Sequence, residues 1–118
     1  MIKRANELKI TPIENMKGGK GTVYRTTSVD AGEYDGKVEV LGRLLLHPGV
    51  SIGEHVHENN EEIMTILTGS VKYTDDGTDC ILNAGDVGIC RKGHSHCVEN
   101  ISETEDATIF ISVNMVDD

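Results

Sequence analysis

The sequence predicts a single all-β domain, folded as a β-sandwich or a β-barrel. A chain of 118 residues has the length of one ordinary domain and leaves no room for a second compact core. Short runs rich in Val, Ile, Leu and Thr alternate with Gly, Asn and Asp along the chain. Apolar residues nowhere keep the period of a helix over successive turns. Many short strands joined by glycine-rich turns are typical of sandwiches and barrels.

The first 20 residues are the least regular part of the chain. Ile10 and Ile13, with a break at Pro12, predict a short extended arm or a single helical turn. The segment Gly18-Gly19-Lys20-Gly21 lacks the Ser or Thr that a phosphate-binding loop carries directly after its Gly-Lys pair, so we interpret it as a flexible turn. We therefore divide the chain into an N-terminal arm, 1–20, and a β domain, 21–118.

Turn residues separate the strands that we expect in the β domain. Asp75-Asp76-Gly77 is a strong hairpin signal, because Asp and Gly adopt the backbone conformations of a tight turn. Other extended runs are interrupted at Pro48-Gly49, Asn59-Asn60, Asn83-Ala84-Gly85 and Lys92-Gly93. The expected strands cover approximately residues 21–28, 38–46, 50–57, 62–67, 71–74, 79–82, 86–90, 95–100 and 107–114.

The charge of the chain argues against nucleic acid and membrane partners. The net charge is −9 and the sequence pI is about 4.9. Such an acidic protein is poorly suited to a phosphate backbone or an anionic bilayer, and its basic residues are dispersed. No run of the sequence approaches the length of a membrane span, and the N-terminus lacks the apolar stretch of a signal peptide.

Three cysteines point to a reducing compartment. Cys80, Cys90 and Cys97 are an odd number, and their spacing fits neither a metal finger nor a redox pair. We interpret them as small buried apolar residues. We therefore expect a cytoplasmic protein with reduced thiols.

Two histidines and a glutamate in the middle of the chain form a candidate metal site. His55 and His57 are two residues apart, so they point to the same face of a strand. The turn at Asn59-Asn60 lets a neighbouring strand return Glu62 to that side. Two imidazoles and one carboxylate on one face suit Fe(II), Mn(II), Ni(II) or Zn(II). For the His-x-His pair alone, an exposed strand that simply carries histidines is the better interpretation.

The spacing around these residues resembles that of the cupin superfamily. Its first motif has glycines around His-x-His and Glu, and Gly49, His55, His57, Glu62 and Gly69 fit every spacing. Its second motif is matched by Gly85, Gly93, His96 and Asn100, while Arg91 stands where proline is usual. The two motifs span 49–100, nearly half the chain.

This resemblance implies a double-stranded β-helix, or jelly-roll barrel, over residues 21–118. It implies one divalent metal ion (Mn, Fe, Ni or Zn) in the wider end, with His55, His57, Glu62 and His96 as ligands. Four protein ligands leave two adjacent positions of an octahedral ion open for a small molecule. The neighbours Glu61 and His94 are competing candidates, but only Glu62 and His96 give the motif spacings.

Three further residues are candidates for the substrate site. Arg43 interrupts the apolar run Val38 to Leu46. It is either a cation that binds a carboxylate inside the barrel or a charge at the surface or a dimer interface. Met64 and Ile66 share strand parity with Glu62, so we expect them to line the pocket below the metal.

Within the cupins, the chain resembles small single-domain bacterial proteins described as oxalate-decarboxylase-like. The shared features are the turn at 18–21, the segment 48–53 before His55, and Gly85-Asp86-Val87. Two-domain oxalate decarboxylases carry an arginine where this chain has Ile52, and a lid loop for which this sequence has no match. Both differences argue against oxalate decarboxylation, while a small carboxylate can still bind.

The sequence leaves three functional classes open. The first is a metal-dependent lyase or oxygenase that acts on an oxalate-like, keto or hydroxy acid, or a cupin of the sugar isomerase type. The second is a non-catalytic cupin that binds or senses a small ligand. The third, a metal-free structural barrel, conflicts with the presence of all four ligand types. We also expect a homodimer, with contacts from the arm, 1–20, and the apolar run Thr108 to Val113.

Overall fold

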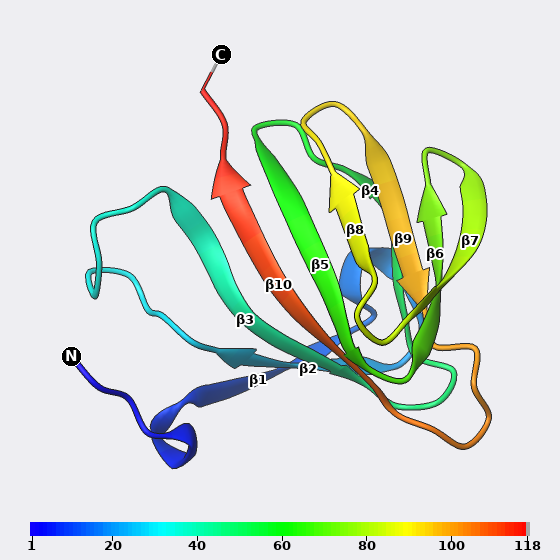
Figure 1. Ribbon diagram of the computed structural model, residues 1–118, viewed down its shortest axis with the longest axis horizontal. Helices are drawn as coiled ribbons and strands as arrows, with labels where there is room; N and C mark the ends of the chain where they lie inside the picture. Colours follow the sequence, from blue (N-terminus) through cyan, green and yellow to red (C-terminus); the bar gives the residue numbers. More distant parts are fainter. Residues whose placement is uncertain (118) are drawn as a thin grey trace.

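The computed structural model describes residues 1–117, which fold into two antiparallel β-sheets around one apolar core (Figure 1). Two short 3₁₀ helices, η1 (Ala5–Glu7) and η2 (Met16–Gly18), lie near the N-terminus. The strands are β1 (Lys9–Glu14), β2 (Thr22–Thr27), β3 (Val38–Leu46), β4 (Ser51–Val56), β5 (Asn60–Thr68), β6 (Ser70–Asp75), β7 (Thr78–Asn83), β8 (Val87–Cys90), β9 (Ser95–Glu99) and β10 (Ala107–Met115).

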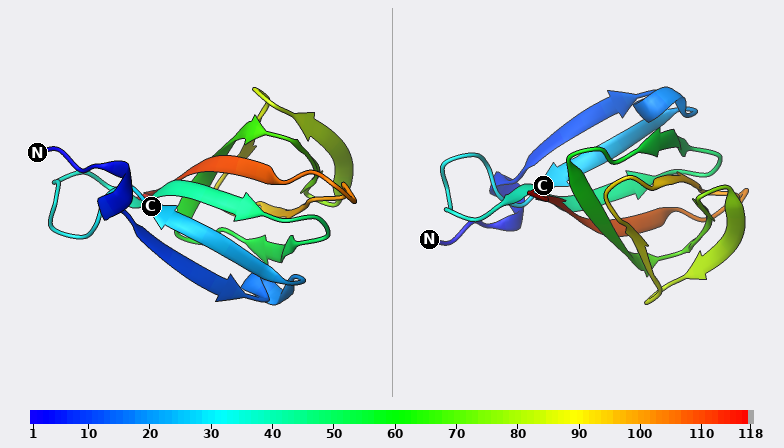
Figure 2. Two further views of the ribbon diagram at one scale, coloured as in Figure 1. Left: turned by 90° about the horizontal axis from the view of Figure 1, so that it is seen from below. Right: turned by 90° about the horizontal axis from the view of Figure 1, so that it is seen from above.

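The strand order confirms the jelly-roll barrel. The larger sheet runs β1-β2-β3-β10-β5-β8, and the smaller one runs β4-β9-β6-β7. The C-terminal strand β10 thus lies between β3 and β5, and β9 lies between β4 and β6. Each sheet therefore interleaves distant parts of the chain. Figure 2 shows the two sheets facing each other across the barrel.

The core is built from alternate residues of the strands. Leu44 and Leu46 of β3, Met64 and Ile66 of β5, and Ile109 of β10 are almost fully buried. Because residues two apart share a face, the intervening side chains point outward. Burial of such a side chain contributes about 1.5–3 kcal/mol.

The N-terminal residues join the barrel. Strand β1 pairs with β2 along its whole length, from Lys9 opposite Thr27 to Glu14 opposite Thr22. Pro12 lacks an N–H and is tolerated because β1 is the edge strand of its sheet. The segment expected to form an arm therefore contributes one strand, β1, to the larger sheet, visible in dark blue in Figure 1.

The hairpin between β6 and β7 follows the prediction. Asp75 pairs with Thr78, so Asp76 and Gly77 form a two-residue turn. Both have positive φ, 46° and 84°, as a type I′ turn requires.

No helix among residues 1–117 is long and apolar enough to cross a membrane.

Candidate metal centre

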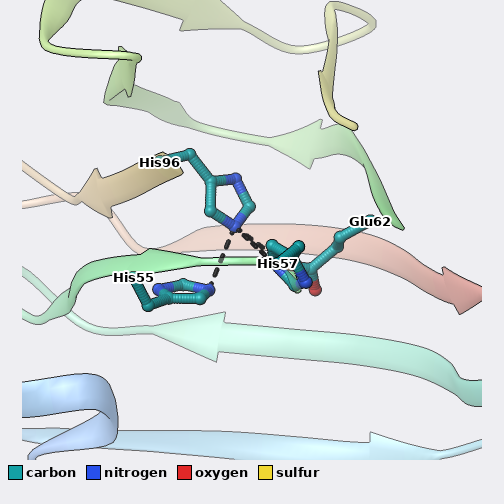
Figure 3. Close-up of side chains that lie close together, drawn as sticks. All are labelled: His55, His57, Glu62 and His96. Carbon is teal, nitrogen blue, oxygen red and sulfur yellow. Dashed lines mark hydrogen bonds and ion pairs between the residues drawn. The ribbon is translucent and has the colours of Figure 1, made fainter. Parts of the chain in front are cut away.

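Three strands bring the four predicted ligands together inside the barrel. His55 lies on β4 directly opposite His96 on β9, and His57 follows one residue after the end of β4. Glu62 lies on the inward face of β5 and is 5% exposed. Figure 3 shows the three imidazole rings and the carboxylate pointing toward one another.

The spacing of the four ligand atoms suits one metal ion. The Nε2 atom of His96 lies 3.0 Å from Nε2 of His57 and 3.1 Å from Nε2 of His55. The Oε1 atom of Glu62 lies 3.2 Å from His57 Nε2 and 3.1 Å from His96 Nε2. Metal–nitrogen bonds are about 2.1 Å long, so ligands at right angles around an ion are about 3.0 Å apart. These four distances therefore match neighbouring corners of an octahedron, and all four ligand atoms lie within 4.8 Å of one another.

Hydrogen bonds on the far side of each ring orient the imidazoles. Nδ1–H of His55 donates to the carbonyl of Gly53 at 2.7 Å, and that of His57 donates to Oδ1 of Asn60 at 2.6 Å. Nδ1 of His96 lies 2.9 Å from the phenol oxygen of Tyr73. With the proton held on Nδ1, every Nε2 lone pair faces the centre. Such outer hydrogen bonds fix the tautomer and the direction of a metal-binding histidine.

The carboxylate remains ionised in this environment. Without a metal ion, the protonated rings of His57 and His96 donate from Nε2 to Glu62, and although burial raises the pKa of Glu62, these hydrogen bonds outweigh burial and hold it at about 2. The hydrogen bond to Glu62 raises the pKa of His57, whereas burial lowers the pKa of His55. Once the rings are neutral, three lone pairs and a negative charge face one another at close range and repel unless a cation lies between them. The donor set therefore fits a divalent metal ion.

A cavity of about 200 Å³ opens beside the cluster. Part of its wall comes from the ligands His55, His57 and Glu62. The remaining wall residues come from η2, β2, β3, β5 and β10, and they are Met16, Lys17, Arg25, Glu39, Val40, Asn60, Ile111 and Val113. The volume is below the roughly 300–1,000 Å³ of pockets for drug-sized ligands, so the cavity suits a molecule of a few heavy atoms.

The structure separates the competing ligand candidates. Glu61 and His94 lie outside the cluster of four ligand atoms. His94 is half exposed, and its ring Nδ1 donates to Asp76 on the β6–β7 turn. The motif spacings thus selected the residues that the fold brings together.

The structure does not place the predicted substrate residues at the cavity. Arg43 lies opposite Phe110 on the exposed outer face of the larger sheet, because its neighbours Gly42 and Leu44 take the inward positions. Placing Arg43 inside the barrel is therefore wrong. Met64 and Ile66 do point inward, as their parity predicted, but they belong to the apolar core and not to the cavity wall.

Sequence reasoning missed Tyr73, Asn60, Lys17 and Arg25. Arg25 shares strand parity with Val23, which is fully buried, so its inward position was readable from the sequence. Tyr73 likewise shares parity with buried Val71. Lys17 had no such signal, because its place depends on how the η2 turn packs against β4.

The sequence also matches known proteins. Residues 42–113, more than half of the chain, match the Cupin domain family. A protein of Thermotoga maritima named oxalate-binding protein is 37% identical over 105 residues, which cover 89% of this chain and 87% of that protein.

Solved structures agree with this assignment. The crystal structure of a predicted oxalate decarboxylase from Thermotoga maritima superposes with a TM-score of 0.91 at 34% identity, over 98% of this chain and 100% of that one. An RmlC-like cupin from Shewanella frigidimarina shares the fold, with a TM-score of 0.73 at 14% identity, over 97% of this chain and 89% of that one. Two glycine-spaced motifs, a jelly-roll barrel and a buried His₃Glu cluster thus agree with the family match, and the chain is a small, single-domain member of the cupin family.

Proposed function

We propose that the protein binds one divalent metal ion through His55, His57, Glu62 and His96, and that the loaded site binds a small carboxylate such as oxalate. The convergence of four ligand atoms, with each imidazole held through its Nδ1, carries this proposal. The four ligands come from three strands of a packed barrel, β4 with the residue that follows it, β5 and β9. The site is therefore formed before the ion arrives, and metal binding needs little reordering of the chain.

The open positions of the ion define the ligand class. An octahedral ion held by four protein ligands keeps two positions, and a bidentate oxygen donor fills both. The cavity beside the cluster accepts only a small molecule. Oxalate, a keto acid or a hydroxy acid meets both conditions, and the name of the Thermotoga maritima relative, oxalate-binding protein, supports the first of these.

The proposal is tested by thermal unfolding with and without metal. Oxalate is expected to raise the melting temperature of Mn²⁺-loaded protein and to leave chelator-treated protein unchanged, since a ligand that binds only the native state stabilises it. Equal stabilisation of both forms would place the anion elsewhere on the surface. Stabilisation by neutral sugars alone would favour a sugar isomerase type of cupin instead.

The same samples separate binding from catalysis. If the oxalate concentration stays constant over hours of incubation in air, the protein is a binding or sensing module. If oxalate disappears while formate or CO₂ accumulates, the protein is a metal-dependent lyase or oxygenase.

A further inference from the structure

We propose that Arg25 and Lys17 bind the oxygens that remain free when a dianion chelates the metal, so that the cavity selects a dicarboxylate over a monoanionic chelator. This inference rests on the proposed function and assigns the ligand class of that site. Three features support it: the buried, unpaired Nε donor of Arg25, the η2 turn that presents Lys17, and the charge of the cavity wall.

The first observation concerns the guanidinium of Arg25. This side chain lines the cavity from β2, on the inward face that it shares with Val23. Its Nε atom is buried and has no hydrogen-bond partner. Within residues 1–117, no carboxylate forms an ion pair with Arg25. A buried donor without an acceptor is costly, so it marks a position where a ligand oxygen would be stabilising.

The second observation concerns the backbone that presents Lys17. Asn15, Lys17 and Gly18 all have positive φ, at 49°, 54° and 84°. For residues other than glycine this left-handed conformation is strained, and such strain persists only where surrounding structure imposes it. The turn therefore holds Lys17 in a defined place at the cavity wall.

Close packing of two glycines imposes that conformation. A Cβ atom on Gly53 of β4 would lie 2.0 Å from the carbonyl oxygen of Lys17, and one on Gly19 would lie 2.1 Å from that of Ser51. Figure 1 shows η2 beside β4, where this contact forms. The carbonyl of Gly53 also accepts the hydrogen bond from His55. The packing of η2 against β4 thus positions both the metal-ligand candidate His55 and the cation Lys17.

The charges on the wall fit a dianion. Lys17 and Arg25 carry two positive charges, and Glu39 and Glu62 carry two negative ones, so the wall is neutral before metal binds. A divalent ion then gives the cavity an excess of two positive charges, although the whole chain has a net charge of −9. A dianion such as oxalate restores neutrality, whereas glycolate, a bidentate monoanion, leaves one charge uncompensated. Arginine also binds carboxylate oxygens through two parallel donors.

Calorimetric titration of Mn²⁺-loaded protein with oxalate and glycolate tests the assignment. The variants are Arg25→Gln, Arg25→Lys and Lys17→Gln, with Arg43→Gln as the control because Arg43 lies on the outer face. Wild type is expected to prefer oxalate. Arg25→Gln is expected to weaken oxalate binding by about tenfold or more, the effect of one charged hydrogen bond. The preference over glycolate is expected to shrink with it, which a merely structural role of Arg25 would not produce.

Each outcome decides the inference. Arg25→Lys keeps the charge but not the Nε donor, so we expect it to lose part of the oxalate affinity, and Arg43→Gln to lose none. If Arg25→Lys and Lys17→Gln both keep the wild-type preference for oxalate over glycolate, the inference is overturned. This outcome decides even if Arg25→Gln does not fold. In that case the proposed function would stand, because metal-dependent oxalate binding would persist. Absence of oxalate binding by loaded wild type would overturn both.

Discussion

The phenol oxygen of Tyr73 lies 2.9 Å from Nδ1 of His96, and both side chains are buried. Burial raises the pKa of Tyr73, so the phenol stays neutral and its oxygen can accept the Nδ1 proton of His96. Gly88 makes room for this ring, because a Cβ atom there would lie 2.6 Å from a ring carbon of Tyr73. A glycine on β8 and a tyrosine on β6 therefore direct a metal-ligand candidate on β9.

Removing this phenol oxygen should weaken metal binding without unfolding the protein. In Tyr73→Phe the ring still fills the core, but His96 loses the partner that fixes its tautomer. Loss of such an outer partner typically lowers metal affinity 10–100-fold, so we expect a decrease of at least about tenfold. Competition with a chromogenic chelator measures it, and Tyr24→Phe on the outer face is the matched control. Equal affinities of the two variants would show that Tyr73 only packs.

The contact between Gly53 and the η2 turn should be essential for both stability and the site. In Gly53→Ala the new methyl group meets the carbonyl of Lys17, which cannot move away as a flexible side chain could. We expect a loss of about 1–3 kcal/mol in unfolding free energy, together with weaker metal binding through His55. Urea unfolding measures the first effect. Gly36→Ala is the control, because its methyl group meets only the side chain of Tyr34. Similar midpoints for the two variants would contradict this account.

The β6–β7 turn should contribute stability that depends on pH. The backbone N–H of Ser95 and the ring of His94 donate to Asp76, and these bonds lower its pKa below the ordinary 3.8. A carboxyl with a depressed native pKa stabilises the fold above its unfolded pKa, and this contribution disappears as the pH falls through the native pKa. Asp76→Asn, which tolerates the left-handed turn, should be less stable than wild type at pH 7. The difference in urea midpoint should shrink below about pH 4; a constant difference would exclude this origin.

The outer face of the larger sheet should be covered by a second copy of the chain. Phe110 on β10 is 37% exposed, and Ile63, Leu67, Val87 and Ile89 on β5 and β8 are also exposed. Such apolar patches commonly mark interfaces. We expect light scattering to give the mass of a dimer, and Phe110→Asp to shift it toward monomer. A monomeric wild type at micromolar concentration would disprove the expectation.

The sequence predicted most of the fold because its strands alternate regularly. The run Val38 to Leu46 is strand β3 with the expected bounds, and Asp76-Gly77 forms the expected turn. Pairing across the barrel did not follow from local pattern. The place of Lys9–Glu14 as an edge strand depends on its pairing with β2, which the turn at 18–21 permits but the local sequence pattern does not specify.

In the candidate site, too, some residues could be predicted from the sequence and others could not. The four residues of the cluster were readable because they belong to two spaced motifs. Arg43 was left open between the inside of the barrel and the surface, although the alternation of β3 from inward-pointing Leu44 places it at the surface. Lys17 could not be placed, since its position comes from two glycines that meet across the fold. Local spacing therefore identified the cluster, and only tertiary packing revealed the cations beside it.

Metal analysis of matched variants tests the central claim most directly. Protein purified without an affinity metal or a chelator is measured for metal content per chain, as wild type and as Glu62→Gln, Glu61→Gln, His96→Ala and His94→Ala. We predict close to one divalent ion per chain in wild type, Glu61→Gln and His94→Ala, and loss of most of it in Glu62→Gln and His96→Ala, because only Glu62 and His96 belong to the cluster. Retention of metal by Glu62→Gln together with its loss from Glu61→Gln would contradict the account.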